Sequence, residues 1–299
     1  MATYSELSPR QSRKLQLRIM IISQKLSNIS LCPPRTRGLL RLHLGCNRAP
    51  KPVLLTAGSA AHNVRTARKA YDLHPGTDIV FWLHQYHDCG LMFMLLTSVS
   101  GATCVLTSPM AFVNRPRIWL EHMTEFKATC TPVPSFTLPL VSISPSYSIA
   151  ENCTFVSTAW RNNNDNSQNS CSPVFPSHNK LLPSARLASD EDEEEMNIIV
   201  VNEHTHEPVN DGIEGEIWVS SPSKGYLGHP LLTQDIFKGK LSNKVNRCYV
   251  RTGDRGIVKG EERFLYVTGR CVEMIQLPNG QEIHPHNIET AAYNSCPQL

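Results

Sequence analysis

The sequence lacks the features that mark several large classes of protein. Its 299 residues contain no apolar run long enough to cross a bilayer, which excludes an integral membrane protein with a transmembrane segment. No two of its 10 cysteines form a CxxC pair, so neither a zinc ribbon nor a thioredoxin-like motif is available. No GxSxG motif of a hydrolase is present. The net charge of +3 is too small to indicate nucleic acid as a partner.

The composition supports a folded protein of one large domain or two ordinary ones. Hydrophobic residues make up 40% of the chain and charged residues 18%, which is enough apolar material for a packed core. The cysteines stand singly in apolar or mixed surroundings, a pattern typical of reduced, buried thiols in a reducing compartment. We therefore expect a cytoplasmic location.

Residues 1–44 differ from the rest of the chain. They contain one acid, Glu6, and eight Arg or Lys residues. Such a start is typical of an organellar transit peptide, but Met20, Ile21 and Ile22 interrupt any amphipathic pattern. We therefore expect a basic, poorly ordered leader and keep the transit peptide as the alternative. Because no aromatic residues are interleaved with the basic ones, the leader does not indicate nucleic-acid binding.

From about residue 50 the hydrophobic pattern alternates between helical and extended spacing. Helices are predicted at 60–71 and 116–126, and strands at 78–83, 101–106 and 127–133. The apolar run 91–96 fits a buried helix, although its periodicity does not decide. This rhythm predicts an α/β layer of parallel strands, in which ligands bind at the carboxyl ends of the strands. The loops carrying His87, Pro134-Ser135 and Tyr147 should gather there.

The second half of the chain has a different pattern. An Asn-rich loop at 161–171 and a run of six acids at 190–195 are typical of solvated loops. From about residue 196 the pattern predicts an all-β segment, with turns at Asp211-Gly212 and Asn279-Gly280. The predicted strands are 197–201, 216–220 and 264–267.

Several motifs occur in an order that points to one family. They are YHDCGL (86–91), PSYSIAENC (145–153), GEIWVSSPSKGYLG (215–228), YVRTGD (249–254) and YVTGR (266–270). Together they resemble the AMP-binding, adenylate-forming superfamily. The stretches FWLHQYHDCGL, PSFTLPLV, SHNKLLPSARL and GQEIHPHNIE are most similar to its fatty acyl-AMP ligase-like branch. The resemblance runs from about residue 45 to the end of the chain.

This resemblance implies a fold and an activity. The fold would be α/β: the large N-terminal domain of an adenylate-forming enzyme, incomplete here, with a β-rich part and a stub of the small C-terminal domain. The activity would be the ATP-dependent conversion of a fatty acid to acyl-AMP with Mg²⁺, and transfer to CoA or a carrier-protein thiol would follow. Such chemistry depends mostly on positioning and charge neutralisation at the α-phosphate.

The resemblance also assigns roles to individual residues of the nucleotide site. Tyr147 matches the aromatic residue that stacks on adenine. Glu151 matches the Mg²⁺-binding acid, since a hard cation prefers carboxylate oxygen. Asp254 matches the acid that accepts both ribose hydroxyls. Arg270 matches the arginine near the ribose and phosphates, where a guanidinium stays charged.

His87 matches the histidine beside the acyl pocket and the reacting carboxylate. Lys51 stands at the lysine of the family's phosphate loop, which corresponds to HLGCNRAPKP (43–52). Here Pro52 replaces the final glycine and removes a backbone N–H, and most of the loop's hydroxyl side chains are missing. Trp82 and two neighbouring methionines fit either an acyl tunnel or the core.

Other departures shape the expected domains. A segment that the family has between PSFTLPLV and PSYSIAENC is missing, which should expose apolar faces. We expect a basic leader at 1–44, a partial AMP-binding domain at 45–270, and a hinge with the start of a truncated C-terminal domain at 271–299. The chain stops before the family's late catalytic lysine. We therefore expect impaired activity, with a non-catalytic nucleotide- or acyl-binding relic, or an interaction protein, as the alternative.

Overall fold

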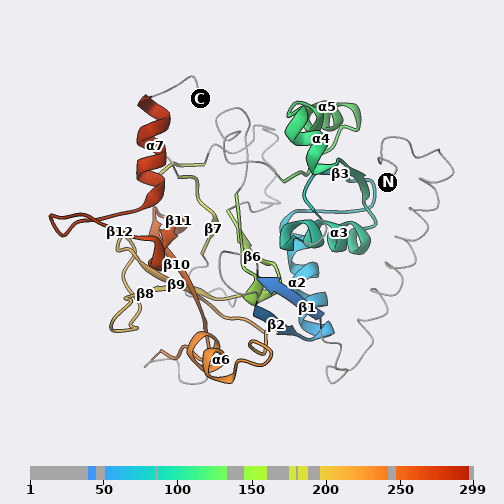
Figure 1. The fold of residues 1–299 in the computed structure, drawn as a ribbon. Coiled ribbons are helices and arrows are strands. Elements are labelled where there is room, and N and C mark those ends of the chain that lie inside the picture. The colour runs from blue at the N-terminus through green and yellow to red at the C-terminus, as the bar shows by residue number, and fades with distance from the viewer. Residues whose placement is uncertain are drawn as a thin grey trace. The chain divides into compact units, whose positions relative to one another are not determined.

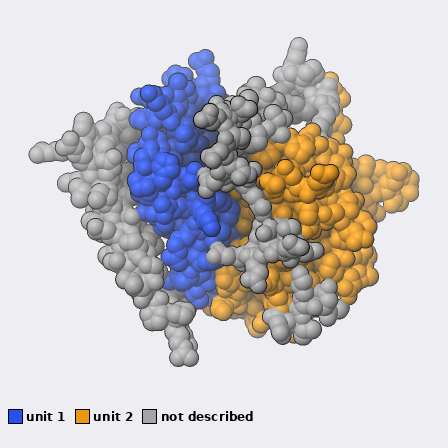
Figure 2. Space-filling view, turned by 180° about the vertical axis from the view of Figure 1, so that it is seen from behind, with its two compact units in different colours: residues 1–143, 148–155, 162–167 blue, residues 144–147, 156–161, 168–299 orange. Residues whose placement is uncertain are grey.

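The computed structural model describes residues 40–44, 51–84, 87–132, 145–159, 175–179, 181–187, 196–241 and 247–295. The basic leader before residue 40, the phosphate-loop residues 45–50, the PSFTLPLV stretch, the Asn-rich loop and the acidic run lie outside the described residues. The chain divides into two compact units (Figures 1 and 2). Unit 1 comprises residues 1–143, 148–155 and 162–167, and unit 2 comprises residues 144–147, 156–161 and 168–299.

Unit 1 begins with an antiparallel hairpin. Strand β1 (Leu40–Leu44) pairs with β2 (Lys51–Leu55), and Leu44 lies opposite Lys51. Helix α2 (Ala57–Ala70) follows directly, because the side chain of Thr56 accepts a hydrogen bond from the amide of Ser59 and caps the helix. Strand β1 lies inside the segment that the sequence assigns to the leader, so the last five residues of that segment form a strand.

The middle of unit 1 is a strand–helix–strand unit. Strands β3 (Asp78–Phe81) and β4 (Thr103–Leu106) are parallel, and helix α3 (Asp88–Ser100) connects them. The expectation of parallel strands is confirmed here. The apolar run 91–96 is helical, because His87 caps the N-terminus of α3 and Gly101, with a φ of 69°, ends it. The core consists of buried side chains from α2, β3, α3 and the strand β6 (Phe155–Thr158), including Val64, Ile79, Phe81, Met92, Leu96 and Phe155.

Two short helices complete the described part of unit 1. Helix α4 (Pro109–Asn114) is capped by Ser108, and α5 (Ile118–Glu125) follows it. The strand expected at 127–133 is reduced, over its described residues, to a single parallel bridge between Cys130 and Ile79. Pro132 has no backbone N–H to donate, which works against a longer ladder here.

Strands β5 (Ser146–Ser148) and β6 (Phe155–Thr158) form a two-stranded sheet, and the short helix η4 (Ala150–Asn152) lies in the connection between them. The boundary between the two units passes through this hairpin. Tyr147 therefore belongs to unit 2, and Glu151 belongs to unit 1.

Unit 2 is built on a five-stranded antiparallel sheet with the strand order β7-β11-β10-β9-β8. Its strands are β7 (Ala185–Arg186), β8 (Ile198–Val201), β9 (Gly215–Val219), β10 (Val250–Lys259) and β11 (Phe264–Arg270). Trp218, Leu241 and Tyr249 are buried against it. The strands expected from the sequence at 197–201, 216–220 and 264–267 are confirmed within one to three residues.

The expectation of an all-β segment after residue 196 is wrong, because the described residues there include two α-helices and a short 3-10 helix. Helix α6 (Pro230–Phe237) begins with a proline at its first turn, where the missing N–H costs nothing. Beyond β11, the helix η5 (Cys271–Glu273) leads into a hairpin of β12 (Ile275–Gln276) and β13 (Glu282–Ile283), and then into α7 (Pro285–Ser295). Gly280 has a φ of 80° in the predicted turn.

Candidate functional site

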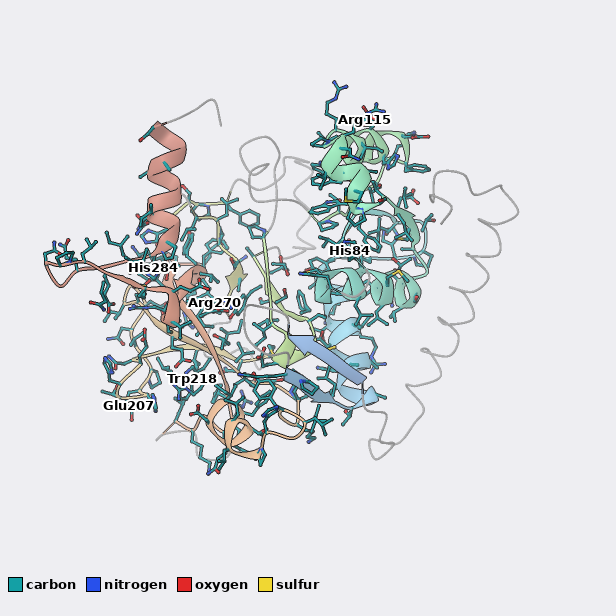
Figure 3. All side chains as sticks on the ribbon, in the orientation of Figure 1. His84, Arg115, Glu207, Trp218, Arg270 and His284 are labelled. Atoms are coloured by element: carbon teal, nitrogen blue, oxygen red, sulfur yellow. The ribbon has the colours of Figure 1, made fainter. Side chains whose placement is uncertain are left out.

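Three residues that the sequence assigns to nucleotide binding meet in unit 2. The hydroxyl of Tyr147, on β5, donates a hydrogen bond of 2.6 Å to Oδ2 of Asp254. Nε of Arg270, at the end of β11, lies 3.3 Å from the other carboxylate oxygen, Oδ1. Figure 3 labels Arg270 at this end of the strand. The arrangement brings an aromatic ring, a carboxylate and a guanidinium together, although Tyr147 is 107 residues from Asp254 along the chain.

The antiparallel pairing of β10 and β11 explains why Asp254 and Arg270 meet. They are direct partners across the two strands, and the register shifts between Arg255 and Gly256 just beyond them. A bulge of this kind increases the local twist and redirects neighbouring side chains, and bulges are common beside functional sites. Side chains of direct partners lie on the same face of a sheet.

Burial and charge act against each other at Asp254, whose residue is only 8% exposed. Burial raises the pKa of its carboxyl above the ordinary value, whereas the hydrogen bond from Tyr147 and the charge of Arg270 lower it. The nearby carboxylates of Glu273 and Glu216 raise it further. Each carboxylate oxygen has two lone pairs, so both oxygens of Asp254 retain the capacity to accept a further hydrogen bond from a ligand.

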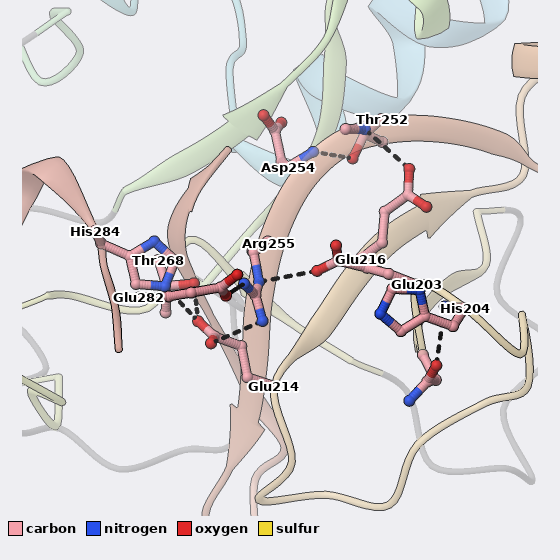
Figure 4. A network of polar contacts seen from close by, with 12 residues as sticks. Glu203, His204, Glu214, Glu216, Thr252, Asp254, Arg255, Thr268, Glu282 and His284 are labelled. Atoms are coloured by element: carbon pink, nitrogen blue, oxygen red, sulfur yellow. Dashed lines mark hydrogen bonds and ion pairs between the residues drawn. The ribbon is translucent and has the colours of Figure 1, made fainter. Parts of the chain in front are cut away.

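A tight turn in β10 presents this carboxylate. Thr252 donates a hydrogen bond of 2.7 Å from Oγ1 to the carbonyl of Ile217, and its Oγ1 accepts one of 3.0 Å from the amide of Asp254. Gly253 adopts a φ of 72°, in the left-handed region that favours glycine. Its amide donates to Glu216 on β9. Figure 4 shows Thr252, Asp254 and Glu216 on these adjoining strands.

Sequence reasoning missed Glu216, although one signal pointed to it. It is an acid in the apolar stretch GEIWV, and the structure buries all five residues of this strand. A buried acid requires partners, and here they are Trp218 on the same strand and Arg251 and Gly253 from β10.

The other predicted site residues belong to unit 1. Lys51 is half-buried at the start of β2, directly after the undescribed loop residues 45–50. Glu151 is half-buried on η4, and η4 contacts β1, the strand that pairs with β2. The strand that η4 contacts is thus the hairpin partner of the strand on which Lys51 lies.

His87 is exposed and serves as the N-cap of α3. Its Nδ1 accepts a hydrogen bond of 3.3 Å from the amide of Cys89. The gathering of loops expected around His87 involves Pro134 and Ser135, which lie outside the described residues. Trp82 stacks on Phe112 with ring centroids 4.1 Å apart. Met92 is buried in the core cluster, as the core alternative predicted.

The donor chemistry of Glu151 fits magnesium. Among the described residues, no three His, Cys, Asp or Glu side chains gather into a metal-binding group. Magnesium in phosphate-transfer sites is commonly held by one or two carboxylates together with substrate phosphates, so a single acid meets the requirement.

A second polar network lies on the same sheet of unit 2 (Figure 4). Arg255 forms ion pairs with Glu203 at 3.0 Å, Glu282 at 3.3 Å and Glu214 at 3.4 Å. Nε2 of His284, which directly follows β13, lies 2.9 Å from Oε1 of Glu214. This network joins the segment after β11 to the sheet.

Comparison with known proteins agrees with the arrangement of the motifs. A family model described as AMP-binding enzyme matches residues 49–146. The chain is 24% identical to a medium-chain fatty acid–acyl-carrier-protein ligase, TtuA, of Teredinibacter turnerae, over 82% of this chain and 48% of that protein. It is 26% identical to a 4-hydroxyphenylalkanoate adenylyltransferase of Mycobacterium marinum, over 88% of this chain and 52% of that protein. These similarities support the resemblance to the AMP-binding, adenylate-forming superfamily that the motifs indicate.

Solved structures of adenylate-forming enzymes share the fold. A fatty acyl-adenylate ligase from L. pneumophila, determined with acyl adenylate and pyrophosphate, superposes with a TM-score of 0.65 at 22% identity, covering 80% of this chain and 52% of that one. The expected α/β fold of an adenylate-forming enzyme is thereby confirmed. The chain spans about half the length of the curated relatives that it matches. In the described part of the chain, no helix has the length and apolar character needed to cross a membrane.

Proposed function

We propose that this chain binds ATP and a fatty acid and converts the acid to acyl-AMP, releasing pyrophosphate. The cluster of Tyr147, Asp254 and Arg270 is the observation that carries the proposal. It combines the aromatic, the acid and the arginine that the family resemblance assigns to the nucleotide, and it does so through direct contacts. The names of the curated relatives and of the L. pneumophila ligase support a fatty acid as the partner of the nucleotide.

Each residue of the cluster has a role that suits its chemistry. The ring of Tyr147 offers a flat face to adenine. The carboxylate of Asp254 accepts the two ribose hydroxyls, since an acceptor-only group suits two donors. The guanidinium of Arg270, whose side chain is 51% exposed, is available to the phosphates.

The residues of unit 1 suit the other end of the reaction. In the roles that the resemblance assigns, Lys51 would supply positive charge to the phosphates and His87 would contact the acyl carboxylate. Glu151 would hold the magnesium ion, which when bound supplies charge neutralisation to the phosphate oxygens. A carboxylate oxygen of the acid attacks the α-phosphorus, the new P–O bond forms, and the bond to pyrophosphate breaks. CoA or a carrier-protein thiol is the proposed acceptor of the acyl group.

One observation favours a second function, namely binding of a nucleotide or an acyl chain without catalysis. Pro52 lies on β2 opposite His43, at the place where the family's loop ends in glycine. It has no amide to offer a phosphate, so the hold on the β- and γ-phosphates is weakened while the ribose cluster is intact.

Incubation of the full chain with labelled ATP, Mg²⁺ and fatty acids of increasing length tests both functions. Acyl-AMP that forms with the wild type and with Asp211→Ala, but not with Asp254→Ala, would support the enzyme. Asp211 is a suitable control because it is an exposed acid paired with Arg263, away from the cluster. Nucleotide binding without any acyl-AMP would support the binding protein, and absence of both would overturn both proposals.

A further inference from the structure

Glu216 is a fully buried acid, only 3% exposed, whose two carboxylate oxygens serve different partners. Oε2 accepts a hydrogen bond of 2.9 Å from Nε1 of Trp218, and two nitrogens of Arg251 lie 3.4 Å from the same oxygen. Oε1 accepts a hydrogen bond of 3.2 Å from the amide of Gly253. One side of the carboxylate is therefore anchored in the sheet, and the other side holds the turn that precedes Asp254.

Few described hydrogen bonds fix the backbone of this turn. Gly253 is in the left-handed region, where a backbone without a Cβ has wide conformational freedom. The described hydrogen bonds that fix it are the one from its amide to Glu216 and the pair made by Oγ1 of Thr252, to Ile217 and from the amide of Asp254. Both anchors start from β9, so β9 sets the backbone of the turn from which the Asp254 carboxylate reaches Tyr147 and Arg270.

We propose that Glu216 is a positioning residue that aims the carboxylate of Asp254 at the ribose hydroxyls and so sets the preference for a ribose with both hydroxyls. The inference rests on the proposed function, because it presupposes that Asp254 receives the ribose. Hydrogen bonds weaken steeply with misalignment, so a small rotation of the turn lowers the affinity for the hydroxyls without removing any ligand-contacting group.

Only a carboxylate satisfies this position. The neighbours that face it are N–H donors from Trp218, Arg251 and Gly253. In a Glu216→Gln variant, one side of the amide presents an NH₂ group, which opposes either the indole and guanidinium donors or the amide of Gly253. The change preserves the shape of the side chain and disturbs the hydrogen bonding that fixes the turn.

A purely structural role for Glu216 predicts a different result. Arg251 also forms an ion pair with a second acid, since Oδ1 of Asp235 lies 3.3 Å from its Nη1. Asp235→Asn therefore removes a carboxylate from Arg251 without touching the turn, and it is the matched control. Thr252→Val disturbs the turn from its other anchor and leaves the buried acid in place.

The test is equilibrium binding of AMP and of 2′,3′-dideoxy-AMP to the full-length chain, at a temperature well below the unfolding midpoint of every variant. Two hydrogen bonds to a charged acceptor predict that the wild type and Asp235→Asn prefer AMP by at least about a hundredfold. Glu216→Gln and Thr252→Val should bind the two nucleotides about equally, with unchanged affinity for the dideoxy compound. A loss of stability alone would leave the ratio of the two affinities unchanged.

The possible failures are distinguishable. If the wild type prefers AMP and folded Glu216→Gln retains that preference, the positioning role is overturned and the proposed function stands. If Glu216→Gln does not fold, a wild-type ratio in Thr252→Val overturns the role in the same way. If the wild type binds neither nucleotide, the proposed function fails and the inference fails with it.

Discussion

The hydroxyl of Tyr147 donates a hydrogen bond of 2.6 Å to one carboxylate oxygen of Asp254. Nε of Arg270 lies 3.3 Å from the other oxygen of the same carboxylate. The carboxylate is thus held from both sides before any ligand arrives. Preorganisation of this kind reduces the ordering that binding would otherwise require. The contact also gives Tyr147 a second role besides offering its ring, and the two roles are separable by mutation.

Tyr147→Phe removes the hydroxyl and retains the ring. A hydrogen bond to a charged group contributes about 1.5–3 kcal/mol, so urea unfolding should show a loss of stability in this range. Tyr266→Phe is the matched control, because the hydroxyl of Tyr266 donates to the neutral backbone carbonyl of Pro176 and its loss should cost only about 0.5–1.5 kcal/mol. Equal losses in the two variants would mean that the charge of Asp254 adds nothing to its hydrogen bond with Tyr147.

The pKa of Asp254 predicts a pH-dependent effect on stability. Burial raises this pKa above its ordinary value of 3.8, while Tyr147 and Arg270 oppose the rise. Between the two values the folded state binds more protons than the unfolded state, so this group's contribution to stability is present below the ordinary pKa and is lost as the pH rises through the raised pKa. The variant Asp254→Asn does not titrate there. Its free energy of unfolding relative to the wild type should therefore increase with pH through this window.

Urea unfolding of both proteins at several values between about pH 3 and about pH 7 measures this difference. A difference that stays constant or declines with rising pH would contradict the raised pKa. The charged, buried carboxylate of Asp254 would then lower the stability of the fold at neutral pH. Such a cost is expected where a buried charge is kept for ligand binding.

The order of helices and strands in unit 1 was largely predictable from the sequence, because residues that cap or end a helix mark their boundaries. Thr56 and Ser108 cap their helices, and Gly101 ends α3. The helical state of 91–96 was not decided by periodicity, since α3 is apolar around most of its circumference and has no single stripe. The end of α5 leads to Pro132, where local propensity suggested a longer strand than the backbone can pair.

The cluster of Tyr147, Asp254 and Arg270 was predictable only through family resemblance. Nothing local to Tyr147 indicates that its partner lies 107 residues away. The role of Glu216 was hidden for the same reason, since Arg251 and Gly253 contact it from 35 and 37 residues further along. The contacts of Glu216 with Arg251 and Gly253 arise from the non-local pairing of β9 with β10. Composition and motif spacing do not predict the register of that pairing.

The environments of the cysteines predict which thiols react. Burial raises the pKa of Cys104 and of Cys130 to about 12 and that of Cys153 to about 11, so these thiols stay protonated at neutral pH. Cys248 is exposed. In the native chain, a thiol-alkylating reagent should modify Cys248 well before these three, as peptide mapping by mass spectrometry would measure. Early modification of Cys104 or Cys130 in native protein would contradict the packing of the unit 1 core, and urea should equalise the rates.

The carboxylate of Glu214 ties the segment after β11 to the sheet. It contacts His284 at 2.9 Å and Arg255 at 3.4 Å, and it accepts a hydrogen bond from Thr268. Glu214→Gln keeps the shape of the side chain and removes the charge that these contacts share. Loss of a charge-assisted contact of about 1–3 kcal/mol should accelerate amide hydrogen exchange in residues 271–295 by about ten- to a hundredfold, while peptides from β9 and β10 change little.

Glu262→Gln provides the comparison for this prediction. Glu262 pairs with Arg186 at 3.4 Å on the same sheet, but its side chain is 54% exposed, and exposed ion pairs contribute little. Exchange in residues 271–295 should therefore match the wild type in this variant. If Glu214→Gln accelerates exchange across the whole of unit 2, its charge supports the sheet as a unit. If exchange accelerates only after β11, Glu214 is a local anchor for β13 and α7, and opening of that segment is independent of global unfolding.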